Sequence, residues 1–107
     1  MKQGDIRWYT FKAPDKKRPV LILTRSDVID YLGEVTVAPI TTTIRDIPSE
    51  MALSIEDGMP RDCAVNFDHT QTVQKGKLGG LITTLPYDKM RLVKQAVMFA
   101  FGLALID

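Results

Sequence analysis

The stretch that decides the fold is Pro19-Val20-Leu21-Ile22-Leu23-Thr24. This run is almost entirely apolar and is too short for a helix, so it predicts a strand that is buried on both faces of a sheet. Proline is tolerated at the first position of such a strand. Val35 to Ile40 forms a second run of the same kind and leads into the hydroxyl-rich Thr41-Thr42-Thr43. The sequence therefore predicts two central strands, the second of which ends in polar side chains.

Shorter segments on either side of these runs also favour strands. Asp5 to Phe11 is rich in β-forming residues, and the polar, basic stretch Lys12 to Lys17 that follows it is expected to be an exposed loop. Further short apolar segments, separated by turn signals, are Met51 to Ile55, Cys63 to Phe67 and Leu81 to Leu85. A total of about five or six short strands is expected.

The last part of the chain changes its period and predicts a helix. Apolar residues recur at three- and four-residue steps at Met90, Val93, Val97, Ala100 and Ala104, with a second stripe at Leu92, Ala96, Phe99 and Leu103. A helix that is apolar on most of its circumference needs cover on more than one side, so its end is expected to be buried, with a partner subunit as one source of that cover. Residues 96–106 are uncharged but fall short of the roughly 20 residues that span a membrane.

Many short strands followed by a terminal helix predict a mainly β fold with a compact, strongly curved sheet. The chain has 107 residues, of which 45% are hydrophobic, so a single domain over residues 1–107 with an ordinary core is expected.

Composition excludes several kinds of site. The 14 basic and 13 acidic residues nearly cancel, so any nucleic-acid site must be a local cluster of cations. The single cysteine, Cys63, and the single histidine, His69, cannot form a disulfide or a Cys/His metal cage within one chain, and neither a metal nor a cofactor is expected. Because the single cysteine cannot form an intramolecular disulfide, a cytoplasmic location is expected, and the charged start of the chain does not read as a signal peptide.

The residues that remain for chemistry suit a phosphate. One histidine rules out a two-histidine ribonuclease mechanism, and the glycines from Gly76 to Gly80 lack the spacing of a phosphate-binding loop, which favours a simple turn there. Arg18 stands at the head of one buried strand, and Thr41 to Thr43 stand at the end of another. A guanidinium and hydroxyl groups can hold a phosphodiester and stabilise extra negative charge on it. A solvated strand end is the competing interpretation of Arg18.

A series of motifs, in order along the chain, resembles the MazF/PemK family of toxins. The motifs are Gly4-Asp5-Ile6-Arg7-Trp8, Lys17-Arg18-Pro19-Val20-Leu21-Ile22-Leu23, Val37-Ala38-Pro39-Ile40-Thr41-Thr42, Ile47-Pro48-Ser49-Glu50, Asp62 to His69, Gln71-Thr72-Val73 and Leu81 to Leu85. Together they cover nearly the whole chain. The resemblance implies an SH3-like curved β-barrel with a C-terminal α-helix, a homodimer, a MazE-like antitoxin as partner, and metal-independent cleavage of single-stranded RNA that leaves a 2′,3′-cyclic phosphate and a 5′-hydroxyl.

The resemblance also assigns catalytic residues. Arg18 matches the catalytic arginine of an Arg-Pro-Val motif, and Thr41 matches the Ser/Thr that closes a Pro-Ile-Thr motif. Asp68 matches an aspartate of the PemK-like branch and is the candidate general base. That branch has an arginine where this chain has Asn66, which puts its acid–base pair in doubt here.

RNA contacts are expected from Lys16, Lys17, Thr42 and His69, with Lys12 as a helper. Trp8 and Tyr9 face opposite sides of the first strand, so one of them is free to stack on a base while the other enters the core. We expect Trp8 to be the one in the core.

Two other functions are compatible with this fold. A CcdB-like toxin that inhibits gyrase has the same size and architecture, but that family ends in a Trp-Gly-Ile-like segment and this chain has no tryptophan after Trp8. A catalytically inactive RNA-binding or antitoxin-binding module is the other alternative, and it would have to arise from the changed surroundings of Asn66 and His69.

Overall fold

A computed structural model describes residues 1–12 and 16–103 of the chain. Its strands are β1 (Asp5–Phe11), β2 (Lys16–Ile22), β3 (Glu34–Thr41), β4 (Glu50–Leu53), β5 (Cys63–Asn66), β6 (Gln71–Gln74) and β7 (Leu81–Thr84). Its helices are α1 (Ser26–Ile29) and α2 (Tyr87–Ala100), with 3-10 turns η1 (Ile55–Asp57), η2 (Phe67–His69) and η3 (Lys75–Lys77). The strand that the sequence did not predict is β6, which has a single buried apolar residue, Val73.

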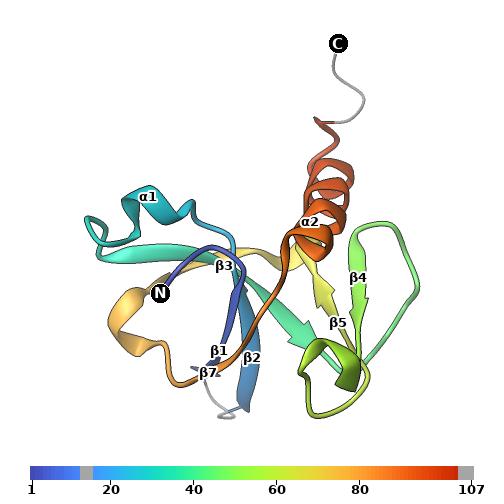
Figure 1. Cartoon of the computed structure of the whole chain (residues 1–107), viewed down its shortest axis with the longest axis horizontal. Coiled ribbons are helices and arrows are strands. Elements are labelled where there is room, and N and C mark those ends of the chain that lie inside the picture. The colour runs from blue at the N-terminus through green and yellow to red at the C-terminus, as the bar shows by residue number, and fades with distance from the viewer. Residues whose placement is uncertain (13–15, 104–107) are drawn as a thin grey trace.

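The strands form one strongly curved sheet that divides at β3. The order of its hydrogen-bonded neighbours is β4-β5-β3-β2-β1-β7, and β6 pairs with β3 as well. The first half of β3, Glu34 to Val37, pairs with β6, whereas Ile40 and Thr41 at its end pair with β5. One long strand therefore belongs to both parts of the sheet, which splay apart on either side of it (Figure 1). This architecture confirms the expected mainly β fold with a curved, half-barrel sheet and a C-terminal helix.

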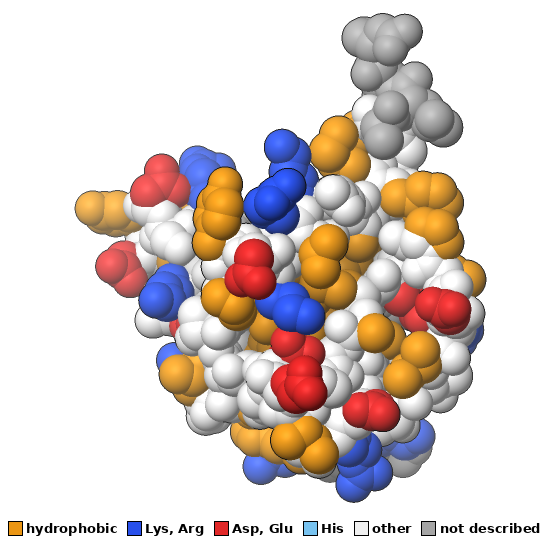
Figure 2. All heavy atoms as spheres, turned by 45° about the vertical axis from the view of Figure 1, so that its right-hand side comes forward, with side chains coloured by type: hydrophobic (Ala, Val, Ile, Leu, Met, Phe, Trp, Pro, Cys, Tyr) orange, Lys and Arg blue, Asp and Glu red, His pale blue; other side chains and the backbone are white. Residues whose placement is uncertain are grey.

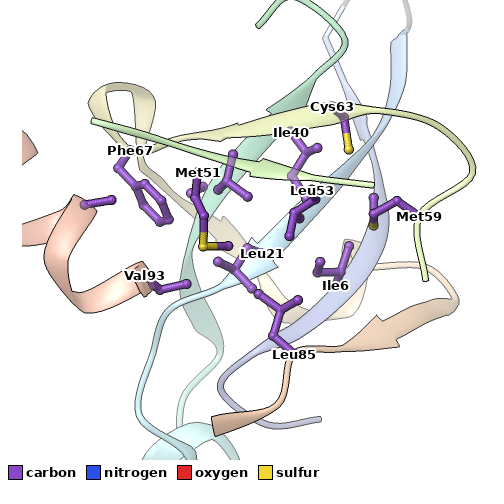
Figure 3. Packing of buried hydrophobic residues seen from close by; sticks show 13 residues of the cluster. Ile6, Leu21, Ile40, Met51, Leu53, Met59, Cys63, Phe67, Leu85 and Val93 are labelled. Atoms are coloured by element: carbon purple, nitrogen blue, oxygen red, sulfur yellow. The ribbon is translucent and has the colours of Figure 1, made fainter. Parts of the chain in front are cut away.

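The two central runs are buried on both faces, as expected. Alternate residues of β2 and β3 supply two separate apolar clusters, because successive side chains of a strand point to opposite faces. Leu21, Ala38 and Ile40 belong to the larger cluster, whose inward-pointing side chains include Phe67 and Met51 (Figure 3). The smaller cluster consists of Val20, Ile22, Ile29, Val35, Val37 and Val73, with Tyr9, Phe11 and Leu78 packed against it.

Helix α2 closes the larger cluster at one end of the sheet. Val93 and Ala96 are buried in that cluster, and Met90, Val97 and Ala100 pack against it, so the expected stripe is confirmed up to Ala100. Ala104 lies outside the described residues. No helix in residues 1–12 and 16–103 is long and apolar enough to cross a membrane.

The described end of α2 is more exposed than the sequence predicted. The exposed fractions are 55% for Phe99, 54% for Phe101 and 47% for Leu103, so the expectation of a buried helix end is wrong for the single chain. Hydrophobic side chains are visible on this face of the molecule (Figure 2). The physical reason is that the sheet covers the side of α2 that carries Val93 and Ala96, whereas Leu92, Phe99 and Leu103 of the second stripe face solvent.

Candidate functional site

The register of the central strands brings Arg18 and Thr41 to the same place. Val20 pairs with Pro39, Leu21 with Ala38 and Ile22 with Val37 in the antiparallel ladder between β2 and β3. Arg18 and Thr41 each lie two residues beyond the Val20–Pro39 pair that ends this ladder. Strand pairing therefore brings together residues that lie at opposite ends of two different predicted strands.

Arg18 and Thr41 both line a pocket of about 470 Å³, which we call the Trp8 pocket. Its lining consists of Trp8, Lys17, Arg18, Pro19, Ile40, Thr41, Thr42, Thr43, Met59, Pro60, Arg61 and Cys63. The floor is apolar, since Ile40, Met59 and Cys63 are almost completely buried. The threonine hydroxyls and the cationic side chains add polar groups to this apolar surface. The pocket thus has the chemistry to hold a flat ring and a phosphate.

A second pocket, of about 340 Å³, adjoins the same arginine. This His69 pocket is lined by Phe11, Lys12, Lys16, Arg18, Pro39, His69 and Gln71. Arg18 is the residue that the two pockets share. Arg18 therefore lies where the two pockets adjoin.

Both pockets are positively charged although the chain is nearly neutral. Their linings include Lys12, Lys16, Lys17, Arg18 and Arg61 and contain no aspartate or glutamate. Among the described residues, the ion pairs that form are Arg25 with Asp27, Arg45 with Glu50 and Lys89 with Asp57. None of these pairs neutralises a cation of the two pockets. The local cationic cluster that an RNA site requires is present.

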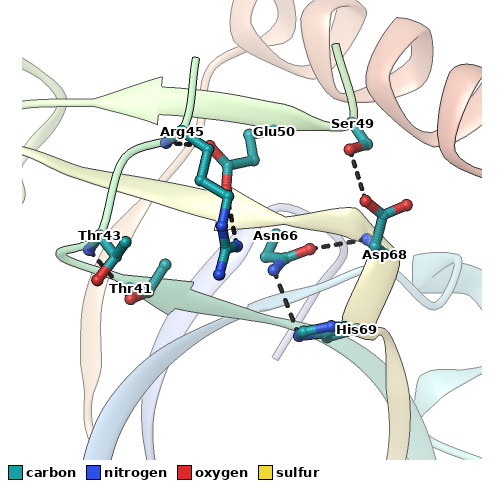
Figure 4. Close-up of polar contacts among 8 residues, drawn as sticks. All are labelled: Thr41, Thr43, Arg45, Ser49, Glu50, Asn66, Asp68 and His69. Carbon is teal, nitrogen blue, oxygen red and sulfur yellow. Dashed lines mark hydrogen bonds and ion pairs between the residues drawn. The ribbon is translucent and has the colours of Figure 1, made fainter. Parts of the chain in front are cut away.

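The loop that follows Thr41 is anchored at both of its ends (Figure 4). The Thr43 backbone N–H donates to Thr41 Oγ1 over 3.1 Å, which leaves the proton of the Thr41 hydroxyl free to donate to a ligand. Further along, Arg45 donates its backbone N–H to Glu50 Oε1 over 2.9 Å, and its guanidinium lies 3.6 Å from Glu50 Oε2. These contacts fix the chain on either side of the Thr42 and Thr43 side chains.

Asn66 orders the η2 turn, which carries Asp68 and His69. Asn66 is buried, and its Oδ1 accepts the Asp68 backbone N–H over 2.9 Å. Its Nδ2 lies 3.3 Å from His69 Nδ1, so the ring nitrogen accepts and the other nitrogen, Nε2, carries a proton that it can donate. The Asp68 carboxylate accepts a 2.6 Å bond from Ser49 Oγ.

The structure separates Asp68 from the other expected catalytic residues. Asp68 lines neither the Trp8 pocket nor the His69 pocket, and in Figure 4 its carboxylate points toward Ser49 and away from Thr41. Arg18 and Thr41 come together in the Trp8 pocket with Lys17 and Thr42, and His69 and Lys16 lie in the adjoining pocket. The role of Asp68 as general base stays a prediction.

Three details of the sequence interpretation need correction. Trp8 is only half-buried and lines a pocket, whereas Tyr9 packs on the smaller core cluster with its ring centroid 4.8 Å from that of Phe11. The expected places of these two aromatic residues are therefore reversed. Ile6 and Trp8 point to the same face of β1, but the larger cluster includes Ile6 and does not extend to Trp8. Lys16 and Lys17 belong to strand β2, since they pair with Phe11 and Thr10 of β1, and residues 13–15 of the expected loop lie outside the described part.

Sequence reasoning missed the Met59-Pro60-Arg61 wall of the Trp8 pocket. These residues follow η1 and reach Trp8 only through the folding of the β4–β5 hairpin, and no motif pointed to them. Burial, with Asp62 and Asp57 nearby, raises the pKa of the Cys63 thiol beside them above 9.0, which disfavours the thiolate. No group of three or more His, Cys, Asp or Glu residues in the described ranges is arranged to hold a metal ion.

Comparison with known proteins gives consistent matches. The family model described as PemK-like, MazF-like toxin of type II toxin-antitoxin system matches residues 2–101. Endoribonuclease MazF3 of Mycobacterium tuberculosis is 42% identical over 83% of this chain and 86% of its own length. The structure of Mycobacterium tuberculosis toxin MazF-mt6 has a TM-score of 0.84 at 37% identity and covers 92% of this chain and 96% of its own.

A mycobacterial endoribonuclease, solved in complex with its cognate antitoxin, has a TM-score of 0.82 at 25% identity and covers 96% of both chains. The family model spans the strands and turns that build the two pockets, and it includes Arg18, Thr41 and His69. The chain belongs to the PemK-like, MazF-like toxins of type II toxin–antitoxin systems.

Proposed function

We propose that this toxin cleaves single-stranded RNA at short sequence motifs without a metal ion, with Arg18 and Thr41 at the reacting phosphate. Relatives that are named endoribonucleases are 36–42% identical over most of the chain, and the chain is an endoribonuclease of this family. The observation that carries the finer proposal is the position of Arg18. It lines the same pocket as Thr41 and is shared by two cationic pockets whose linings contain no carboxylate.

In the proposed reaction the ribose 2′-oxygen attacks the adjacent phosphorus, and the bond from phosphorus to the 5′-oxygen breaks. The 2′-hydroxyl loses its proton to a base, and the leaving 5′-oxygen gains one, so the products are a 2′,3′-cyclic phosphate and a 5′-hydroxyl. Negative charge builds up on the phosphate oxygens along this path. The fixed charge of Arg18 and the free hydroxyl proton of Thr41 stabilise that charge.

The candidates for proton transfer are Asp68 and His69. Asp68 remains the candidate base from the family resemblance, although its carboxylate accepts from Ser49 and lies outside the two pockets. His69 presents its Nε2 proton because Nδ1 accepts from Asn66, which suits donation to RNA in the His69 pocket. We assign His69 to RNA contact and use Asp68→Asn as the test of the base.

The remaining RNA contacts follow the same cluster of cations. Lys16 lines the His69 pocket and Lys17 the Trp8 pocket, so both ammonium groups are placed to contact phosphates on either side of Arg18. Thr42 lines the Trp8 pocket at the start of the anchored loop. Its hydroxyl offers a hydrogen bond to a phosphate or a base edge.

A MazE-like antitoxin and a second copy of the toxin are the proposed partners. The endoribonuclease solved with its cognate antitoxin supports the first, and the two cationic pockets would accept an acidic antitoxin tail. The exposed Phe99, Phe101 and Leu103 support the second, because a homodimer would cover these side chains. Phe99→Ser should then shift the purified chain from dimer to monomer in light scattering.

The function is tested by incubating the chain with a long single-stranded RNA in EDTA and mapping the new 5′ ends. Arg18→Ala and Thr41→Ala should each lower the rate at discrete cuts by about a hundredfold or more, as the loss of a donor to a developing oxyanion does. Arg91→Ala is the matched control, since Arg91 is an exposed arginine of α2 that lines neither pocket.

Each result discriminates among functions. Discrete cuts in EDTA that depend on Arg18 and Thr41 support the metal-independent nuclease. RNA that stays intact, together with inhibition of gyrase, would replace the proposal with the CcdB-like function. Binding of RNA or antitoxin without cleavage or gyrase inhibition would identify an inactive module.

A further inference from the structure

Trp8 is held rigidly from behind, with its ring beside the proposed phosphate site. The Gly79 backbone N–H donates to the Trp8 carbonyl over 2.7 Å, and the Trp8 N–H donates to the Gly80 carbonyl over 3.1 Å. A Cβ added to Gly79 would lie 3.3 Å from the Trp8 carbonyl oxygen and 3.4 Å from Trp8 Cβ. Only a residue without a side chain fits this close approach easily. Gly79 and Gly80 thus fix the Trp8 backbone at this place.

One face of the indole is covered by a group that can leave. The Lys17 ammonium lies 5.3 Å from the centroid of the Trp8 ring. Lys17 is exposed, and a cation–π contact at an exposed site is weak. A phosphate next to the ring would attract the same ammonium more strongly, because it offers a full negative charge. The face of the indole therefore becomes available when a nucleotide chain enters.

The rest of the pocket matches a nucleobase. Buried Met59 and Cys63 and the ring of Pro60 give apolar walls, while Arg18 and Arg61 are the polar groups at its boundary. Bases bury a flat aromatic face and keep their ribose phosphate in water, so they need this combination.

We propose that the Trp8 pocket is a nucleobase subsite of the enzyme. The base of one nucleotide next to the phosphate on Arg18 stacks on the indole of Trp8, against the Met59-Pro60-Arg61 wall, and displaces the Lys17 ammonium onto a neighbouring phosphate. This inference rests on the proposed cleavage of RNA. It adds Trp8 as a residue that binds one base of the cut site.

The test compares wild type with Trp8→Ala and Trp8→Phe on short RNA that carries the mapped cut motif. An abasic nucleotide is placed on the 5′ or the 3′ side of the cut phosphate. In wild type, loss of the stacked base at one of these positions should lower kcat/KM by about tenfold. In Trp8→Ala that same abasic position should cost nothing more, whereas Trp8→Phe should retain most of the difference.

Tyr87→Ala is the control, because Tyr87 is an aromatic residue of α2 that is 82% exposed and lines neither pocket. Trp8 is the one tryptophan in the chain, so its fluorescence reports on this pocket alone. An uncleavable 2′-deoxy version of the motif should quench the emission, and the version that lacks the stacked base should not.

The outcomes separate this inference from the proposed function. If wild type cuts RNA but both abasic positions cost the same in wild type and in Trp8→Ala, the nucleobase subsite is refuted and the nuclease stands. Unchanged tryptophan emission on saturation with the deoxy motif would also refute the subsite. If wild type cuts no RNA at all, both the proposed function and this inference fail.

Discussion

Arg45 and Glu50 form a charge pair whose disruption should depend strongly on which partner is removed. The Glu50 side chain is 3% exposed and the Arg45 side chain 54% exposed, with 3.6 Å between Arg45 Nη1 and Glu50 Oε2. Within the described residues Glu50 Oε2 has no hydrogen-bond partner, and Oε1 accepts the Arg45 backbone N–H. A buried carboxylate with a single hydrogen bond depends on its cation.

The magnitudes follow from this arrangement. Breaking a fully buried ion pair by removing one partner costs about 3–5 kcal/mol. Because Arg45 is half-exposed and water screens the pair, Arg45→Ala should lower the free energy of unfolding by about 1–2 kcal/mol. Glu50→Gln removes the buried charge but keeps an oxygen that accepts the Arg45 N–H, so its cost should stay within about 1 kcal/mol. In the double variant, Arg45→Ala should cost nothing further.

The assay is urea denaturation followed by circular dichroism, with all four proteins at one concentration so that any association is held constant. The double-mutant cycle should give a coupling of about 1–2 kcal/mol. If Arg45→Ala lowered the free energy of unfolding equally in the wild-type and Glu50→Gln backgrounds, the reasoning would be refuted, since the guanidinium would then not interact with the carboxylate. A Glu50→Gln variant less stable than Arg45→Ala would refute it as well.

Other substitutions should report on packing, backbone strain and ionisation. Phe67→Ala should cost about 3–5 kcal/mol in urea denaturation, because Phe67 is completely buried in the larger cluster. Gly58→Ala should lower the melting temperature by at least about 4 °C, since Gly58 has φ of 94° and an added Cβ would lie 2.6 Å from Thr83 Oγ1. Gly76→Ala is the control, because a Cβ there meets nothing within 4 Å and should change the melting temperature little. Burial raises the pKa of Cys63 above 9.0, so the protonated thiol favours the folded state at lower pH, and this contribution to stability falls as pH rises past 9. In urea titrations at increasing pH, the Cys63→Ala variant should therefore lose less stability than wild type over this range.

The sequence predicted the parts of the fold that follow from burial. Val20 to Ile22 and Val35 to Ile40 are buried almost throughout, so their continuous apolar pattern could not be mistaken for a half-exposed strand. Strand β6 escaped prediction because Gln71, Thr72 and Gln74 are exposed around Val73. Its place is decided by pairing with β3, which is a long-range contact and leaves no local pattern.

The candidate site, like the fold, could be predicted from the sequence only in part. Family motifs led to Arg18 and Thr41, but their meeting in one pocket depends on the pairing of β2 with β3, which motifs do not contain. Arg61 and Met59 enter the site through the β4–β5 hairpin and had no local signal. The burial of Trp8 was predicted wrongly because an aromatic residue in a strand is usually a core residue. Which residues of a strand the core covers depends on the curvature of the whole sheet, and here Trp8 lines a pocket instead.

The position held by Asn66 suggests how the chemistry is divided in this chain. The Asn66 side chain makes only internal contacts: its Oδ1 accepts the Asp68 N–H and caps the η2 turn, and its Nδ2 faces His69 Nδ1. Its neutral amide also carries no charge that could bind a phosphate. Its amide keeps Nδ1 of His69 an acceptor, which leaves Nε2 as a donor toward RNA. In the proposed reaction the positive charge at the phosphate then comes from elsewhere, and Arg18, with no carboxylate lining either of its pockets, is the residue that we propose for this role.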